Sequence, residues 1–125
     1  MQAYWLTSTL ILRALAAAKR RGLDVAVILD KSQDRRGDTR GRYSSAVYLV
    51  HAGVPVWMDD APAIAHNKVV IIDDAAVVTG SFNFTKAADA RNAENVVVLD
   101  SAEVAAWFTR NWEERRAASR PFEAE

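Results

Sequence analysis

Residues 65–84 read AHNKVVIIDDAAVVTGSFNF, and this stretch decides the fold. It contains two apolar runs, at 65–73 and 76–80, joined by a short acidic turn, a pattern that predicts a β-hairpin. We expect residues 81–85 to continue the second strand outward. The hairpin therefore supplies two adjacent strands of a sheet, and the flanking segments must supply the other strands and the helices that cover it.

The N-terminal half of the chain alternates strands with helices. Its apolar runs predict three strands, at residues 1–6, 24–30 and 54–58. Two helical stretches lie between them, at about 8–21 and 44–52. Ser8 is suited to cap the first helix, and Gly22 and Gly53 follow the two helices, where glycine commonly ends a helix. The spacing of the first helix places on one apolar face Leu10, Ile11, Ala14, Leu15 and Ala18.

The C-terminal third predicts a polar connection or short helix at 86–92, a strand at 94–99 and a helix at 101–118. We expect the tail after this helix to fray. Strands that first alternate with helices and then form a hairpin indicate an α/β fold with a mixed β-sheet flanked by helices, in one domain spanning 1–125. The apolar positions at helical spacing in the last helix are Val104, Trp107, Phe108 and Trp112.

The overall composition restricts the chemistry. The 125 residues include no Cys, which excludes disulfides and thiolate metal sites. Because no metal-binding motif of histidines or carboxylates is present, we expect no metal and no cofactor. The 16 cationic and 16 acidic residues cancel, which argues mildly against a nucleic-acid binder. However, residues 31–42 (KSQDRRGDTRGR) carry five cations, and this loop is either an ordinary solvated segment or one that steers phosphates.

The sequence gives no sign of membrane insertion or export. No apolar run approaches the length of a membrane span, and we expect no stable membrane association. The first twenty residues do not resemble a signal peptide, because their positive charges follow the apolar stretch. The compartment is left unassigned: cytoplasmic by default, and secreted or periplasmic if an upstream signal exists.

Polar side chains gather at one end of the expected hairpin. His66 and Lys68 share a face because strand side chains alternate, and Val70 and Ile72 should carry that face into the core. By contrast, His51 lies near a helix end with no lysine after it. An imidazole beside an ammonium can attack a phosphorus atom while the cation binds the phosphate oxygens.

The second strand repeats this arrangement. Ser81 and Asn83 share one face of the expected outward extension, whereas Phe82 and Phe84 share the other, apolar face. If the polar faces of the two strands agree, a hydroxyl and an amide join the histidine and the lysine around one position. Such a group of donors suits a phosphate.

The spacing His66-x-Lys68-(x)4-Asp73 resembles the H-x-K-x4-D signature of the phospholipase D superfamily, and GSFN at 80–83 resembles its usual companion. The blocks AAAKRRGLDVAVILDKS, AGVPVWMDD and RNAENVVVL are also similar to the small single-motif bacterial endonucleases of the Nuc type. This resemblance covers nearly the whole chain. It implies a metal-independent phosphodiesterase that hydrolyses DNA, or RNA, through a phosphohistidine. Asp73 belongs to the signature, but strand parity points it away from the site, so we expect it to have a structural role at the turn.

The resemblance also implies roles for individual residues. His66 is the nucleophile, and Glu94 is the acid that holds its second ring nitrogen. A carboxylate that accepts the Nδ1 proton leaves Nε2 free to attack. The groups that bind the phosphate are Lys68, Ser81 and Asn83.

The mechanism needs a second imidazole, because one neutral and one protonated histidine must flank the phosphate. One chain holds a single H-x-K motif, and His51 is poorly placed to be the other. We therefore expect a homodimer with the active site at its twofold interface. In the resembling nucleases an earlier strand and helix precede the segment matching residues 1–6, so we also expect this domain to be shortened at its N-terminus.

Two other functions stay open. The first is a lipid phosphodiesterase of the same superfamily, which would share the chemistry but differ in the headgroup pocket. The absence of an amphipathic, membrane-seeking segment opposes it. The second is a catalytically incompetent, nucleic-acid-binding fragment. The intact set of candidate site residues opposes that reading.

Overall fold

The computed structural model describes residues 1–34 and 44–124, so most of the basic stretch at 31–42 lies outside the described residues. The strands are β1 (Gln2–Ala3), β2 (Val27–Asp30), β3 (Val56–Asp59), β4 (Lys68–Ile72), β5 (Ala76–Gly80), β6 (Val96–Asp100) and β7 (Arg120–Pro121). The helices are α1 (Thr9–Arg20), the 3-10 helix η1 (Lys31–Gln33), α2 (Ser45–His51), α3 (Lys86–Ala90) and α4 (Ala102–Ala118).

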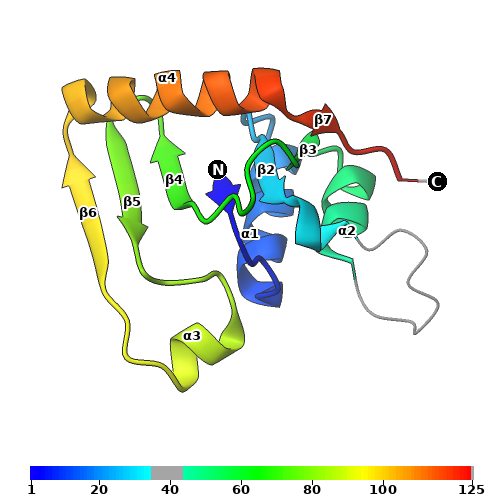
Figure 1. Ribbon diagram of the computed structural model, residues 1–125, viewed down its shortest axis with the longest axis horizontal. Coiled ribbons are helices and arrows are strands. Elements are labelled where there is room, and N and C mark those ends of the chain that lie inside the picture. Colours follow the sequence, from blue (N-terminus) through cyan, green and yellow to red (C-terminus); the bar gives the residue numbers. More distant parts are fainter. Residues whose placement is uncertain (35–43, 125) are drawn as a thin grey trace.

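The strands form one sheet in the order β6-β5-β4-β1-β2-β3-β7 (Figure 1). β1, β2 and β3 run parallel to one another, and every other pairing within the described sheet is antiparallel. The predicted class, α/β with a mixed sheet flanked by helices, is therefore confirmed. Because the short strand β1 lies between β2 and β4, it joins the parallel part of the sheet to the hairpin.

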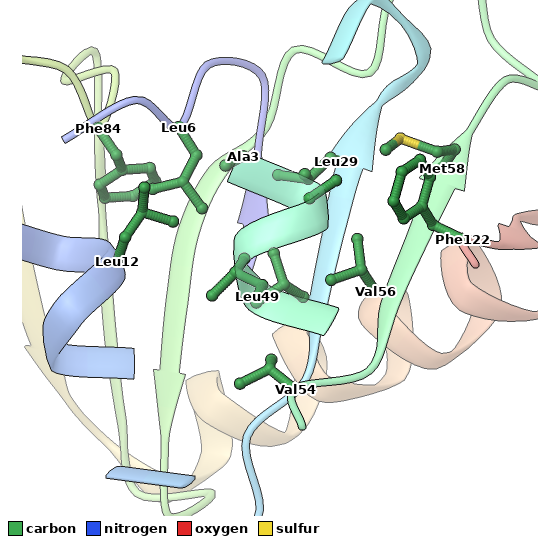
Figure 2. Close-up of a cluster of buried hydrophobic side chains, with 12 residues drawn as sticks. Ala3, Leu6, Leu12, Leu29, Leu49, Val54, Val56, Met58, Phe84 and Phe122 are labelled. Carbon is green, nitrogen blue, oxygen red and sulfur yellow. The ribbon is translucent and has the colours of Figure 1, made fainter. Parts of the chain in front are cut away.

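The two faces of the sheet are covered by different helices, as alternation along β4 shows. Val70 packs against the larger core cluster. That cluster includes Leu12 of α1 and Leu49 of α2 (Figure 2). Val69 and Ile71 belong to a smaller cluster under α4, around Ala105. Figure 1 shows α4 running along one end of the sheet, from β6 to the region of β3 and β7. None of the described helices combines the length and the hydropathy of a bilayer crossing.

Helix α1 begins as predicted, but its buried face matches the prediction only in part. The Ser8 Oγ accepts the Ile11 N–H at 3.5 Å, which is the expected N-cap. Of the predicted face, Ile11 and Leu15 pack against the main core, but the fully buried residues are Leu12 and Ala16, and Leu10 is 74% exposed. Apolar residues surround most of this helix, and periodicity therefore did not single out the face that meets the sheet.

The predicted strands are present but shorter, and two segments differ. β1 ends at Ala3, and residues 81–85 leave the sheet after Gly80 instead of extending it. β4 starts at Lys68, so His66 precedes the strand. Ile72 is 46% exposed rather than part of the core, because it adjoins the hairpin turn.

The C-terminal region also departs from prediction in two places. Trp107 is 55% exposed and does not join the apolar face of α4, where Val104 and Phe108 pack. The tail does not fray, because β7 pairs with β3 and Phe122 is buried in the main core. The predicted strand at 94–99 is β6, which lies at the edge of the sheet with all its residues exposed.

Candidate active site

The candidate site begins where the chain enters β4. His66 is exposed in the loop just before the strand, and Lys68 is buried at the first strand position. The Lys68 Nζ donates to the His66 carbonyl oxygen at 2.9 Å, which fixes the ammonium beside the histidine backbone. Burial lowers the pKa of Lys68, and the nearby Glu94 carboxylate partly opposes this shift. The structure therefore brings the predicted His66 and Lys68 together.

Tyr4, which sequence analysis did not single out, packs against both residues. Its ring meets the His66 imidazole edge-on, with centroids 4.7 Å apart at 62°. The Lys68 Nζ lies 5.5 Å from the centroid of the same ring, within reach of a cation–π contact. The Tyr4 N–H also donates to the Asn67 carbonyl at 2.9 Å. The segment after β1 thus forms one wall of the site.

A second group of polar residues lies in the segments that follow β5 and precede β6. The Ser81 Oγ donates to Glu94 Oε2, and the Asn92 Nδ2 donates to Glu94 Oε1 at 3.0 Å. These hydrogen bonds, from Ser81 first and then Asn92, lower the pKa of Glu94. Among the described residues no hydrogen bond joins Glu94 to His66, so the expected contact is not formed. Both carboxylate oxygens of Glu94 instead accept hydrogen bonds from Ser81 and Asn92.

Gly80 makes this junction possible. A Cβ at Gly80 would lie 2.0 Å from the Asn95 carbonyl oxygen, closer than any side chain can approach. Without a side chain, the two backbones meet: the Ser81 N–H donates to the Asn95 carbonyl at 2.9 Å, and the Asn95 N–H donates back to the Ser81 Oγ at 3.0 Å. The glycine of the GSFN block therefore sets the position of Ser81.

Asn83 takes a different environment from the other predicted phosphate ligands. Its Oδ1 is buried with no hydrogen-bond partner among the described residues. Phe82 and Phe84 on either side pack against the main core. The chain has turned out of the sheet here, so the predicted shared face of Ser81 and Asn83 is not formed by strand alternation.

Asp73 lies at the opposite end of β4 from Lys68. It and Asp74 have φ of 55° and 50°, and the Ala75 N–H donates to the Ile72 carbonyl at 3.0 Å, as in a type I′ turn. The Asp73 carboxylate accepts no hydrogen bond from a described residue, whereas Asp74 Oδ1 accepts one from Thr109 at 2.8 Å. The signature thus spans both ends of the strand, and only one end carries the histidine.

An apolar cavity of about 210 Å³ opens beside the lysine. Apart from Lys68 and Thr79 it is lined by apolar residues and Gly80. In the described part of the chain, no three His, Asp or Glu side chains converge as metal ligands would. The site therefore consists of a histidine, a buried cation, a hydroxyl and a carboxylate next to an apolar hollow. The apolar lining residues are Ile11, Val78, Phe82, Phe84 and Val96.

Comparison with known proteins identifies the family of this chain. The family described as "Cardiolipin synthase, PLD-like domain" matches residues 1–116. The chain belongs to the phospholipase D superfamily. The predicted relationship is therefore confirmed. The structure of Nuc from Salmonella typhimurium, a phospholipase D family member, has a TM-score of 0.88 and 41% identity over 99% of this chain and 80% of that chain.

Other relatives carry lipid names. A protein named phospholipase D from Rickettsia bellii is 46% identical over 94% of this chain. The human protein named mitochondrial cardiolipin hydrolase is 31% identical over 81% of this chain. The chain spans 56% of the length of the Rickettsia relative and 38% of the human one. The NucT structure from Helicobacter pylori shares the fold, with a TM-score of 0.80 at 24% identity.

Proposed function

We propose that this domain is an endonuclease that hydrolyses phosphodiester bonds of DNA, or RNA, with His66 as the covalent nucleophile. The observation that carries the proposal is the exposed His66, whose backbone carbonyl accepts a hydrogen bond from the buried Lys68 ammonium and whose imidazole contacts the same Tyr4 ring as that ammonium. The 41% identity to Nuc across nearly the whole chain favours a nucleic-acid substrate. An exposed nucleophile with a cation held nearby is what attack on an anionic diester requires.

The reaction proceeds in two displacements. The Nε2 lone pair of His66 forms a bond to phosphorus, the bond to the leaving oxygen breaks, and that oxygen takes a proton from a second, protonated histidine. Water then attacks the phosphohistidine, its proton passes to the second histidine, and the N–P electron pair returns to His66. The two steps consume one diester and one water and yield one phosphomonoester and one hydroxyl, with both histidines returned to their starting protonation states.

The remaining site residues stabilise the charge on the phosphate and orient the groups around it. Lys68 neutralises the charge that develops on the phosphate oxygens, and the Asn83 amide supplies a further donor. Ser81 supports these groups through Glu94, which accepts its hydroxyl proton in a hydrogen bond. Glu94 was expected to hold the histidine ring. Its contacts support a role through Ser81 and Lys68, because Ser81 occupies one carboxylate oxygen and the negative charge partly offsets the burial that lowers the pKa of Lys68.

The second imidazole comes from His66 of a second copy in a twofold homodimer. Within one chain the alternative is His51, the last residue of α2, on a helix packed with α1 in the main core and separated in sequence from the strand that carries Lys68. A symmetric partner supplies a matching group without further residues. The two histidines would then titrate as a coupled pair.

The decisive experiment is cleavage of plasmid and single-stranded DNA in excess chelator, with wild type beside His66→Ala. Cleavage by the wild type that resists chelation, together with a phosphorylated protein band trapped only when His66 is present, is expected. Activity that chelator abolishes and Mg²⁺ restores would replace the phosphohistidine with a metal mechanism. If the cleaving species sediments with the mass of a monomer, the proposed active site shared between two copies is wrong.

A lipid phosphodiesterase is the second candidate, and one observation favours it. The apolar cavity of about 210 Å³ is lined in part by Lys68, which would suit a phosphate with an attached apolar group. The lipid names of the Rickettsia and human relatives agree with this reading. Headgroup release from cardiolipin or phosphatidylcholine vesicles, assayed beside DNA cleavage with the same preparation, separates the two substrates.

A further inference from the structure

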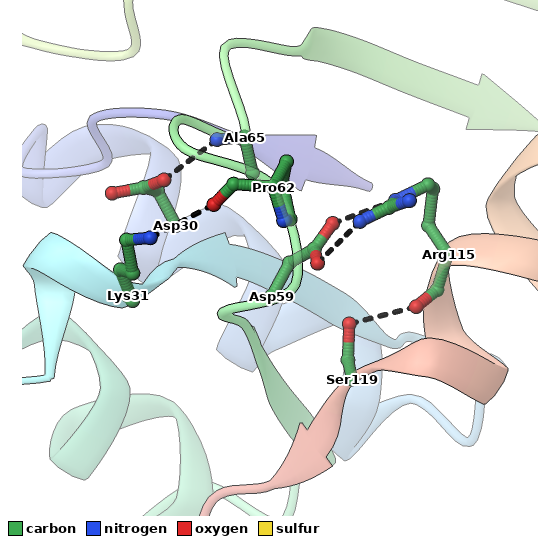
Figure 3. Close-up of polar contacts among 7 residues, drawn as sticks. All are labelled: Asp30, Lys31, Asp59, Pro62, Ala65, Arg115 and Ser119. Atoms are coloured by element: carbon green, nitrogen blue, oxygen red, sulfur yellow. Dashed lines mark hydrogen bonds and ion pairs between the residues drawn. The ribbon is translucent and has the colours of Figure 1, made fainter.

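The loop that delivers His66 to the site is held by two consecutive residues at the end of β2. Asp30 Oδ2 accepts the Ala65 N–H at 2.7 Å, and the Lys31 Nζ donates to the Pro62 carbonyl at 2.8 Å (Figure 3). Both bonds cross more than thirty positions of sequence and end in residues 60–67, which link β3 to β4. Asp30 and Lys31 thus grip the loop at two points, one of them next to His66.

Burial shows where the loop is anchored. Ala65 is 7% exposed, while its neighbours Ile64 and His66 are both exposed. The Ala65 N–H is therefore taken away from water, and a buried N–H needs an acceptor. Asp30 supplies it. A loop that is largely solvated is consequently fixed at the residue that precedes the nucleophile.

Asp30 differs from Asp59, the buried carboxylate at the C-terminal end of the neighbouring strand β3. Asp59, at the end of β3, forms a two-pronged ion pair with Arg115, at 2.6 and 2.8 Å, which ties β3 to α4 (Figure 3). Asp30 is 3% exposed, and its oxygens accept the backbone N–H groups of Ser32 and Ala65 instead. Burial would raise the pKa of Asp30, but the hydrogen bonds from Ser32 and Ala65 outweigh it and keep the pKa lowered. The carboxylate is therefore ionised while it binds the loop.

We propose that Asp30, assisted by Lys31, is a positioning residue that sets the location of the His66 imidazole for attack. This inference rests on the proposed role of His66 as nucleophile. A displacement of about 1 Å in a reacting group can slow a reaction by up to about a hundredfold while substrate binding is retained. Asp30 touches neither substrate nor reacting atoms, so its effect must pass through Ala65 to His66.

Asp30→Asn is the central variant, because it keeps the shape of the side chain but leaves only one oxygen for two N–H donors. Asp60→Asn is its matched control, since Asp60 begins the same loop but is exposed and pairs with Arg120. The chain has two histidines, so NMR of histidine-labelled protein reports His66 with His51 as an internal reference. We expect Asp30→Asn to shift the His66 ring resonances and leave those of His51 in place. Asp60→Asn should move neither.

The kinetic result expected for Asp30→Asn is a fall in kcat of about tenfold to a hundredfold with KM within about twofold of wild type. A purely structural role would lower the melting temperature without a selective His66 shift, and this outcome overturns the proposal. So does an unchanged His66 spectrum with unchanged kcat.

Lys31→Met keeps the test decisive if Asp30→Asn does not fold, because Lys31 is exposed and its loss removes the Pro62 contact and a cation near Asp30 but leaves the Asp30–Ala65 hydrogen bond in place. We expect a smaller selective shift of His66 and a kcat loss of a few fold. An unmoved His66 in this variant would overturn the proposal. A wild-type chain that cleaves neither DNA nor lipid would remove the proposed function, whereas the histidine resonances would still decide whether Asp30 positions His66.

Discussion

The two ends of β4 contain residues of the same signature but differ in what those residues do. At one end an exposed histidine lies against Tyr4, and a buried lysine binds the backbone beside it. At the other end Asp73 and Asp74 adopt positive φ in a tight turn, and the Asp73 side chain accepts no hydrogen bond from a described residue. A five-residue strand of about 3.3 Å per residue keeps these ends more than about 10 Å apart. One short motif therefore combines two residues of the candidate active site, His66 and Lys68, with a residue that shapes a turn, Asp73.

The largest expected effect belongs to the end of β4 that carries His66 and Lys68. His66→Ala should reduce cleavage by at least about a thousandfold, because loss of a covalent nucleophile removes the main route of reaction. Stability should change little, since the side chain is exposed before the strand begins. Single-turnover cleavage and urea denaturation measure the two quantities. A variant that cleaves near the wild-type rate would remove the distinction between the two ends.

The next effect tests why the junction between β5 and the segment before β6 requires glycine at position 80. Gly80→Ala should lower the free energy of unfolding by about 3 kcal/mol, because its Cβ would meet the Asn95 carbonyl. Gly53→Ala is the control, with φ of +80° but no neighbour closer than 4.0 Å, and should cost about 1 kcal/mol. Urea denaturation gives both values. Equal losses would mean that backbone conformation, and not the β5–β6 contact, makes Gly80 necessary.

A smaller effect concerns the ionisation of Lys68. Because burial lowers its pKa, kcat/KM should begin to fall at a pH below the ordinary lysine value of 10.5. Lys68→Arg should move this alkaline limb to higher pH, although at a lower maximal rate, because a guanidinium stays charged. The linkage has the corresponding sign: the folded state releases the proton more readily, so this group costs stability at neutral pH and the cost is relieved as pH rises toward 10.5.

The comparison is checked by kcat/KM profiles from pH 7 to 11 for both proteins. Identical alkaline limbs would assign the ionisation to another residue.

The smallest effect belongs to the turn. Asp73→Asn should change stability by no more than about 0.5 kcal/mol and activity by less than about twofold, since asparagine tolerates positive φ as aspartate does. Asp73→Val, in contrast, should cost about 1–2 kcal/mol, because a β-branched side chain is strained there. Thermal unfolding and DNA cleavage supply the two measurements. A large catalytic loss in Asp73→Asn with unchanged stability would place Asp73 in the chemistry and undo the comparison.

Local patterns were sufficient to predict most elements. The alternation and acidic turn predicted the hairpin, and β5 spans the expected residues 76–80. Ser8 caps α1 as expected. The same kind of pattern brought His66 and Lys68 together, because neighbours two positions apart stay close whatever the rest of the chain does.

Contacts between distant segments could not be read in this way. The contacts of Tyr4 with the His66 loop arise because β1 is inserted between β2 and β4, and the contact of Asp30 with Ala65 arises at the adjoining edge of the sheet. No spacing in the sequence encodes either contact, although a charged residue that ends an apolar strand is a usable signal for Asp30. Alternation also failed after Gly80, where a close backbone approach turns the chain and gives Asn83 its own environment.

The edge strand β6 has a practical consequence for handling the protein. Among the described residues no strand pairs with its outer edge, and Val96, Val97 and Val98 are 50%, 48% and 67% exposed. Free backbone groups beside apolar side chains are a template for strand addition and aggregation. Concentrated samples therefore have a route to self-association unrelated to catalysis. A dimer mass supports the shared active site only when it persists in Val98→Lys, whose charge blocks edge pairing but lies away from His66.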